Sequence, residues 1–367
     1  MNQPEEEQED PKTSNPVSSE PPTRPVEKGA AKSRPKKRGL KIWVFRLMAI
    51  LIPLVATELG ARAYFFLFVH DNIPDEFQSD SEIPYRFPAN SNFLCADTPT
   101  TTNNLQLRET ENIDVRVPYQ GTRIICLGDS VTFGYCASGN EKTYPALLEK
   151  ILRSRGYKVQ VINGGMPRYR AQHVSVFYSQ HLEPLRADVV IQLGGWNNAN
   201  DQILLRDKNA MVELVHRHWY TFRMIRHWGL FKSLGGGSHH PATLSPEGIS
   251  KYRSALKEIR HLAKRFRATP LFCTLPHFFD RLDSDEARQK ALLFPPGGTP
   301  EQIAEAVGEM NDQIREVALA EWPAIELTDV NEHRYFGDAI HPNDLGCQKI
   351  AEQVADYLIQ KDLVGKN

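Results

Sequence analysis

The stretch RIICLGDS, residues 123–130, joins a run of mainly apolar side chains to a polar turn. Residues 123–128 have the length of a strand, and an apolar run without alternation is typical of a strand buried on both faces of a parallel sheet. Further runs of this kind occur later in the chain, at residues 159–163, 189–193, 271–275 and 324–327. The sequence therefore predicts a mainly parallel sheet of five strands.

Helical patterns separate these runs, and two of the helices begin with clear signals. Ser245-Pro246 precedes apolar residues at helical spacing, and Thr299-Pro300 with Gln302 precedes another such pattern. The alternation of strands and helices predicts a three-layer α/β domain. Ligand sites in such domains lie beyond the carboxyl ends of the strands, so the residues just after each run are candidate site residues.

Polar residues at these positions form a set that suits acyl transfer. Gly128-Asp129-Ser130 follows the first run, Asn163-Gly164-Gly165 ends the second, and residues 194–198 follow the third. Asp338 and His341 lie near the carboxyl end, just before the last predicted helix. Each motif alone is common, but their joint position supplies a hydroxyl nucleophile, oxyanion donors, an imidazole base and a carboxylate that orients the base.

With these four blocks, the sequence resembles the SGNH (GDSL) hydrolase family, and the segment before the nucleophile block is similar to that of membrane-anchored bacterial members. The resemblance covers about residues 121–358 and implies a flavodoxin-like sheet. It also implies that Ser130 is the nucleophile, His341 the base and Asp338 the residue that orients it. The implied oxyanion hole consists of the Ser130 and Gly165 N–H groups and the Asn197 amide.

One position departs from the family pattern, because Asn198 stands where the family usually has Asp. This position normally supports its block, so the difference concerns local hydrogen bonding more than the chemistry. The residues that we expect to contact substrate are Asp129, Trp196, Asn198 and, after the fourth strand, His277.

The implied activity is that of a serine esterase acting on an acyl or acetyl ester of an envelope component, carried by a small molecule or a polysaccharide. Two alternatives remain open. A transferase that passes the acyl group to a polysaccharide hydroxyl uses the same residues, and a noncatalytic carbohydrate-binding or assembly module uses the same cleft. The chemistry requires neither a metal nor another cofactor.

The N-terminal region predicts a membrane anchor. Residues 1–40 contain almost no large apolar side chains, which is typical of a disordered tail. The end of this tail is basic, the apolar stretch 41–69 follows at once, and the residues beyond it are acidic. By the positive-inside rule, the tail is expected in the cytoplasm and the hydrolase domain on the other side of a cell membrane.

Three charged residues interrupt the apolar stretch, so a cleaved signal peptide and a buried helix of a soluble domain stay open as alternatives. Arg46 lies near the cytoplasmic end and can reach the interface, while Glu58 and Arg62 have the i, i+4 spacing of a helical ion pair.

The rest of the chain divides into two further parts. Residues 70–120 are polar and rich in turns, which predicts a stalk and a lead-in to the hydrolase domain at residues 121–362. Within that domain, residues 199–244 form a long aromatic and basic insertion. It is interpreted as an extra helix at the domain edge, with a lid or a surface facing membrane or polysaccharide as alternatives.

Overall composition excludes one class of partner and limits disulfide bonding. Asp and Glu number 45 against 44 Lys and Arg, so no large field of one sign is available to bind nucleic acid. Five cysteines are too few and too scattered for a disulfide scaffold. If the domain lies outside the cytoplasm, Cys95 and Cys136 are the candidate pair.

Overall fold

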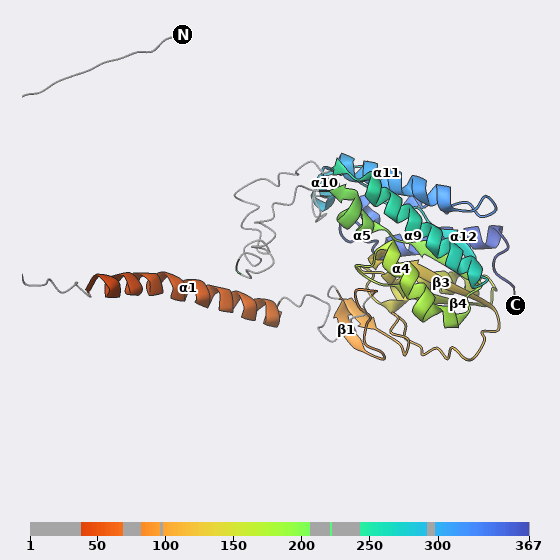
Figure 1. Cartoon of the computed structure of the whole chain (residues 1–367). Coiled ribbons are helices and arrows are strands. Elements are labelled where there is room, and N and C mark those ends of the chain that lie inside the picture. The colour runs from red at the N-terminus through yellow and green to blue at the C-terminus, as the bar shows by residue number, and fades with distance from the viewer. Residues whose placement is uncertain are drawn as a thin grey trace, which may run out of the picture. The chain divides into compact units, whose positions relative to one another are not determined.

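The computed structural model describes residues 38–68, 82–95, 98–205, 221, 243–291 and 298–366. Residues 1–37 of the predicted tail, most of the acidic flank after the apolar stretch and most of the insertion 199–244 lie outside the described residues. Residues 38–40, predicted as the end of the tail, belong to a helix. The described part confirms the predicted α/β fold, in which helices cover both faces of a parallel sheet (Figure 1).

The central sheet has four parallel strands in the order β4-β3-β5-β8. Their bounds are Thr122–Gly128 for β3, Val159–Gly165 for β4, Val189–Leu193 for β5 and Thr269–Phe272 for β8. All four overlap runs predicted from the sequence, although β8 shares only residues 271 and 272 with the predicted run 271–275. Their carboxyl ends lie at one edge of the sheet.

The number of strands differs from the predicted five. The run at residues 324–327 forms a single parallel bridge, between Ile325 and Cys273 just beyond the end of β8. Ile325 exchanges backbone hydrogen bonds with Phe272 and Thr274, but the Leu327 N–H donates to the Thr274 hydroxyl instead of a backbone carbonyl. The ladder therefore ends before a fifth strand is formed.

The helices lie on the two faces as the chain direction requires. The β3–β4 and β4–β5 connections cross the sheet in opposite directions, and right-handed crossovers place their helices on opposite faces. Helix α3 (Tyr144–Ser154) packs with α12 (Asp344–Gln360), while α4 (Ala171–Phe177) and α11 (Pro300–Val317) pack against α9 (Pro246–Arg265) (Figure 1).

The predicted helix starts are confirmed. The Ser245 hydroxyl accepts a hydrogen bond from the Gly248 N–H at the start of α9. Thr299 and Gln302 form a reciprocal capping box at the start of α11. The other elements described after residue 121 are short: α2 Ser130–Phe133, α5 Trp196–Asn198, α10 Asp285–Ala291, β6 Leu204–Leu205, β7 Thr243–Leu244 and single turns at Asn140–Lys142, Tyr178–Leu182, Glu183–Leu185, Ala199–Ile203, Thr328–Val330 and His333–Tyr335.

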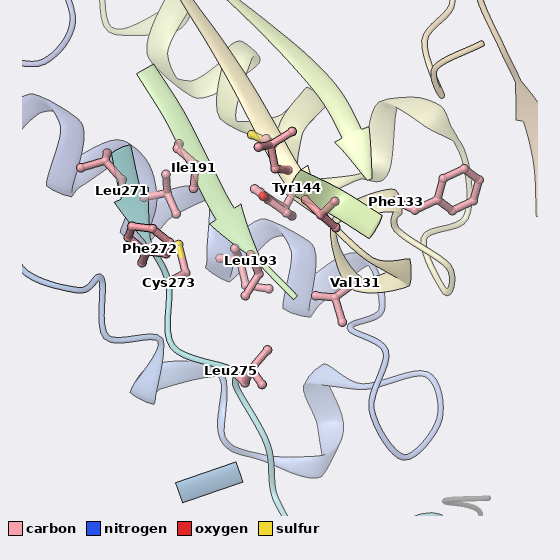
Figure 2. Packing of buried hydrophobic residues seen from close by; sticks show 14 of the residues in the cluster. Val131, Phe133, Tyr144, Ile191, Leu193, Leu271, Phe272, Cys273 and Leu275 are labelled. Atoms are coloured by element: carbon pink, nitrogen blue, oxygen red, sulfur yellow. The ribbon is translucent and has the colours of Figure 1, made fainter. Parts of the chain in front are cut away.

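The core around the strand ends holds the short helix α2 in place (Figure 2). Val131 and Phe133 of α2 are buried, as are Leu193 at the end of β5 and Tyr144 at the start of α3. The Thr132 hydroxyl donates to the Leu193 carbonyl at 2.6 Å, which ties α2 to β5. The element that follows β3 is thus fixed by packing as well as by hydrogen bonds.

The lead-in before β3 folds onto the same core. It contains the antiparallel pair β1 (Asn92–Cys95) and β2 (Thr98–Thr101), and several of its apolar side chains are buried. Arg108 donates to the carbonyls of Phe133 and Gly134 at 3.1 and 2.6 Å, and so holds the end of α2. The Glu109 carboxylate accepts the Asn163 N–H at 2.7 Å along the open edge of β4.

The N-terminal helix α1 covers Arg38–Phe68. Within it, Lys41–Ala63 is long and apolar enough to cross a membrane, with a mean hydropathy of 1.9. The expected ion pair between Glu58 and Arg62 forms, with 3.1 Å between Oε1 and Nε.

Candidate active site

The end of β3 places Ser130 at the start of α2, beyond the carboxyl edge of the sheet. Asp129 is the N-cap of this helix, and Gly134 ends it in the left-handed conformation with a φ of 84°. A helix has no internal acceptor for its first N–H groups, so the Ser130 N–H at this position is available to a ligand. The helix start therefore offers both a hydroxyl and an anion-binding N–H.

His341 and Asp338 complete a hydrogen-bonded chain with Ser130. The His341 Nε2 lies 2.8 Å from the Ser130 Oγ, although the two residues are 211 positions apart. The His341 Nδ1 lies 2.6 Å from the Asp338 Oδ2. The structure thus brings together all three residues that the sequence predicts for nucleophile, base and orienting carboxylate.

A turn holds the Asp338 carboxylate in this position. Its Oδ1 accepts the backbone N–H groups of Ile340 and His341 at 2.9 and 2.8 Å, and the Gly337 N–H donates to the His341 carbonyl. Burial raises the pKa of Asp338, but the hydrogen bond and charge of His341 and the two backbone donors outweigh it, so that the pKa lies below its usual range. Asp338 is therefore ionised where the imidazole is neutral.

A second connection joins the nucleophile loop to the helix that follows His341. Asp344, in the first turn of α12, accepts hydrogen bonds from the Ser138 N–H and hydroxyl at 2.8 and 2.6 Å. The segment that carries Ser130 and the segment that carries His341 are therefore held together by a contact other than the Ser130–His341 hydrogen bond.

Two residues of the nucleophile loop also approach His341 and Asp338. The Tyr135 ring lies against the His341 imidazole, with 4.6 Å between centroids, and the Cys136 Sγ lies 3.8 Å from the Asp338 Oδ2. All five cysteines are free thiols, so the expected pairing of Cys95 with Cys136 is not formed.

Cys136, Asp338 and His341 together have the donor types of a metal site, with ligand atoms within 4.8 Å of one another. However, a metal ion on the Nδ1 of His341 would have to replace the hydrogen bond to Asp338. The donor set therefore competes with the arrangement that orients the imidazole.

Asn197 lies beside Ser130 and carries a suitable donor for an oxyanion. One N–H of its side-chain amide donates to the Tyr169 carbonyl at 3.1 Å. An Asn amide has two N–H donors, and Asn197 lines the same pocket as Ser130. The Tyr169 contact thus fixes the amide and leaves its second N–H for a ligand.

Gly165 has a different role from the one expected. Its N–H donates to the Asn163 side chain at 3.0 Å, and the residue is buried outside the pocket lining. A Cβ at this position would lie 2.1 Å from the backbone nitrogen of Phe133. Gly165 is therefore required for the close approach of α2 to β4, and its N–H is already bonded within the fold.

Asn198 is completely buried beneath the pocket. Its side-chain oxygen, Oδ1, accepts the Ala171 N–H at 2.9 Å. Its side-chain NH₂ group donates to the side-chain oxygens of Gln172 and Gln202, both at 3.0 Å. Asn suits this position because two of its three partners are acceptors, whereas a carboxylate has no donor to offer them. The departure from the family pattern is thus matched by local partners.

The other expected substrate contacts also lie outside the pocket lining. Asp129 is buried and accepts three backbone N–H groups, from Val131, Gly195 and Trp196. Burial raises its pKa, and these donors oppose the rise. Asp129 therefore joins the turns after β3 and β5, which carry Ser130 and Asn197.

Trp196 and His277 likewise belong to the packing around the site. Trp196 is buried beside the Phe279 ring, with 6.0 Å between centroids. His277 stacks on the same ring, and burial lowers its pKa. With Asn198 and Asp129, all four expected contact residues thus lie outside the pocket lining.

A cavity of about 330 Å³ opens over Ser130 and His341. Part of its wall comes from the lead-in, with Tyr85 and Phe87, and part from Tyr135 and Arg168. Sequence reasoning missed these residues, because their place depends on contacts between distant segments. Tyr85, for example, reaches the loop after β4 by donating its hydroxyl to the Pro167 carbonyl at 2.7 Å.

Removing the Asn197 amide tests its expected role as an oxyanion donor. We expect Asn197→Ala to lower kcat for aryl acetate hydrolysis by about 10²- to 10³-fold, the usual loss for one such donor. Steady-state kinetics of the folded variant measure the effect.

The matched control is Asn198→Asp, one residue along the chain. A carboxylate at this position still accepts the Ala171 N–H, and the two glutamine amides can rotate to donate to it, so we expect a modest change in kcat. Equal, small effects of both substitutions would show that Asn197 is not an oxyanion donor.

The chain is similar to a known family of proteins. A model of the GDSL-like lipase/acylhydrolase family matches residues 126–349, which include Ser130, Asp338 and His341. A search of curated proteins found no match.

Similar solved structures include a lipase/acylhydrolase from Enterococcus faecalis, with 16% identity over 67% of this chain and 98% of that one and a TM-score of 0.44. An alpha/beta hydrolase from the metagenome of Lake Arreo has 15% identity over 68% of this chain and 100% of that one, with a TM-score of 0.42. An acetyl xylan esterase has 14% identity over 64% of this chain and 98% of that one, with a TM-score of 0.41.

Proposed function

Because the chain belongs to the GDSL-like lipase/acylhydrolase family of ester hydrolases, we propose that it is a serine esterase that acts on an acyl or acetyl ester of an envelope component. The observation that carries the proposal is the continuous hydrogen-bonded chain from the Ser130 hydroxyl through His341 to Asp338, with distances of 2.8 and 2.6 Å. This is the geometry that activates a serine nucleophile.

The reaction begins with attack on the ester carbonyl. The Ser130 Oγ bonds to the carbonyl carbon while its proton passes to the His341 Nε2. Asp338 accepts the Nδ1 proton in a hydrogen bond, so that Nε2 is the free acceptor, and it stabilises the imidazolium that forms. The proton then passes from His341 to the departing alkoxide, and the acyl group stays on Ser130.

The negative charge on the carbonyl oxygen is stabilised by two donors, the Ser130 N–H and the Asn197 amide. Both belong to turns that Asp129 ties together through backbone hydrogen bonds, so little reorganisation is needed during the reaction. Water, activated by His341, then releases the acyl group from Ser130.

A covalent probe tests the proposed nucleophile directly. We use the full chain in detergent, an aryl acetate as substrate, and a fluorophosphonate that bonds to activated serines. The expected result is turnover that the probe abolishes, with one adduct on Ser130 by mass spectrometry. Ser138 is the internal control, because Asp344 rather than a histidine engages its hydroxyl. Label at another residue, or neither turnover nor label, would overturn the proposal.

We also propose that α1 anchors the esterase in the membrane with the hydrolase domain outside the cytoplasm. The proposal is supported by the apolar span Lys41–Ala63 and by the basic residues that precede it.

The orientation is tested with a reporter enzyme that is active only outside the cytoplasm. Fused after Gln120, the reporter should be active, because the preceding helix carries it across. Fused after Arg38, before the apolar stretch, it should be inactive. Activity in the second fusion only would reverse the proposed orientation.

A further inference from the structure

Arg168 lines the pocket that contains Ser130 and Asn197. It lies in the loop between β4 and α4, and its side chain is exposed. The mechanism proposed above makes no use of it. Its charge nevertheless stands close to the reacting groups, and the remaining question is what that charge binds.

The backbone around Arg168 holds the residue in an unusual conformation. Its φ of 63° lies in the left-handed region, which is unfavourable for a residue with a side chain. Both neighbours are fixed: the Pro167 carbonyl accepts the Tyr85 hydroxyl, and the Tyr169 carbonyl accepts the Asn197 amide. The loop therefore presents Arg168 at the pocket in a defined place.

The charge of Arg168 has no counter-ion among the residues that the structure describes. Arg170, two positions along, pairs with Asp201 at 3.0 Å. The one carboxylate in the pocket lining, Asp338, is engaged by His341 and two backbone donors. The positive charge of Arg168 is thus left for a ligand.

The Arg168 charge also acts on two tyrosines of the pocket lining. Burial raises the pKa of Tyr85 and of Tyr135, two further residues of the pocket lining, and the Arg168 charge opposes the rise in both. An anion bound beside these tyrosines would therefore lie close to the guanidinium.

A second polar group lies at the pocket without a partner inside the described ranges. The Asn200 Oδ1 is buried, lines the pocket and accepts no hydrogen bond within the described ranges. Buried acceptors without a donor are costly, so a ligand that brings an O–H group to this atom gains affinity.

We infer that Arg168 selects substrates that carry a carboxylate close to the scissile ester, and that the natural substrate is an O-acylated acidic sugar or a similar hydroxy acid. A guanidinium forms two parallel hydrogen bonds with a carboxylate, and Asn200 accepts a hydroxyl of the same unit. The cavity of about 330 Å³ has room for one such unit, so ester and carboxylate belong to one residue of the substrate. The inference rests on the proposed esterase function.

The test compares pairs of esters in which one member carries a carboxylate and the other is neutral. One pair is 4-acetoxybenzoate and its methyl ester, with the charge on the alcohol side; the other is 4-nitrophenyl hydrogen succinate and 4-nitrophenyl butyrate, with the charge on the acyl side. We expect Arg168→Gln in the full chain to lower the ratio of kcat/KM, charged over neutral, by about 10- to 100-fold in at least one pair. Arg168→Lys should restore part of that ratio.

Arg170→Gln is the matched control, because it removes the same charge two residues away, at an arginine already paired with Asp201. It should leave both ratios unchanged. Ratios that are the same in Arg168→Gln and in the unmodified chain would overturn the inference, as would equal losses in Arg168→Gln and Arg170→Gln.

A binding experiment separates this inference from the esterase proposal. Ser130→Ala retains the pocket, so binding of 4-acetoxybenzoate and its methyl ester to this variant is measured by calorimetry with and without Arg168→Gln. If the unmodified chain hydrolyses none of the esters, the esterase proposal fails, whereas preferential, Arg168-dependent binding of the anion still supports the inference. Equal binding of both compounds overturns it whatever the outcome for hydrolysis.

Discussion

Replacing Ser130 by alanine is expected to lower kcat for aryl acetate hydrolysis by about 10⁶-fold, to a residual rate that reflects binding and the oxyanion donors alone. The size of the effect follows from the proposed mechanism, in which the Ser130 Oγ forms the bond to the acyl group. No other hydroxyl is bonded to the His341 Nε2 among the contacts of the described chain, so none can replace it.

The Ser130→Ala protein should remain folded. The side chain of Ser130 is small, and within the described ranges it forms a hydrogen bond with His341. Ser138→Ala is the control, because it removes a hydroxyl from the same loop. A rate within tenfold of the unmodified chain in Ser130→Ala, with circular dichroism unchanged, would rule out Ser130 as the nucleophile. The losses of kcat in Ser130→Ala and His341→Gln should not add in the double variant, since the two groups act as one unit.

Much of the fold could be predicted because its strands are continuous apolar runs. Buried parallel strands need such runs, and β5 was predicted at its observed bounds, Val189–Leu193. The starts of α9 and α11 were equally clear, because capping is a local interaction between residues three positions apart. The fifth run could not be excluded from the sequence, since its pairing ends through a contact with the distant Thr274.

The candidate site was predictable where residue type fixes the chemistry. Few mechanisms use a hydroxyl, an imidazole and a carboxylate that lie after strands or before the last helix. The structure brings these groups together in Ser130, His341 and Asp338. Supporting and contacting residues were harder to separate. Asp129 and Asn198 follow strand ends as Ser130 and Asn197 do, and their inward orientation depends on backbone donors that the sequence does not show.

Gly165 and Arg168 illustrate what local sequence cannot decide about a loop. A glycine at the end of a strand can allow close packing or can offer a free N–H to a ligand. At Gly165 close packing is the reason, because the backbone of Phe133 leaves no room for a Cβ. Arg168 carried no signal for the pocket, because its conformation is set by Tyr85 in the lead-in and Asn197 after β5. Walls built from distant segments are therefore visible only in the structure.

Replacing Asp338 is expected to lower kcat by about 10⁴-fold while the fold stays intact. Asp338→Asn is the sharper substitution, because its carbonyl oxygen can still accept the Ile340 and His341 N–H groups that shape the turn. Its NH₂ group, however, faces the His341 Nδ1 and forces that atom to act as acceptor. The imidazole proton then lies on Nε2, which can no longer take the proton of Ser130.

The pH profile separates this effect on the base from a loss of structure. Because the pKa of Asp338 is held below its usual range, the carboxylate stays ionised as the pH falls through the range where imidazoles titrate. Its contribution to stability is present above the pKa of the unfolded chain and is lost only when the pH falls through the lowered pKa. The acid limb of kcat/KM in the unmodified chain should therefore report protonation of His341.

In Asp338→Asn the imidazolium loses its negative partner, so the protonated base is less stabilised and the acid limb should move to lower pH, at a much reduced rate. Asp338→Ala should give the same shift together with a lower melting temperature, since it also removes the acceptor of two backbone N–H groups. Turnover near that of the unmodified chain in Asp338→Asn, with an unchanged acid limb between about pH 5 and 8, would remove Asp338 from the mechanism. A flat profile over the same range in the unmodified chain would remove His341, and no turnover of any ester by the unmodified chain would favour a noncatalytic binding module on the same fold.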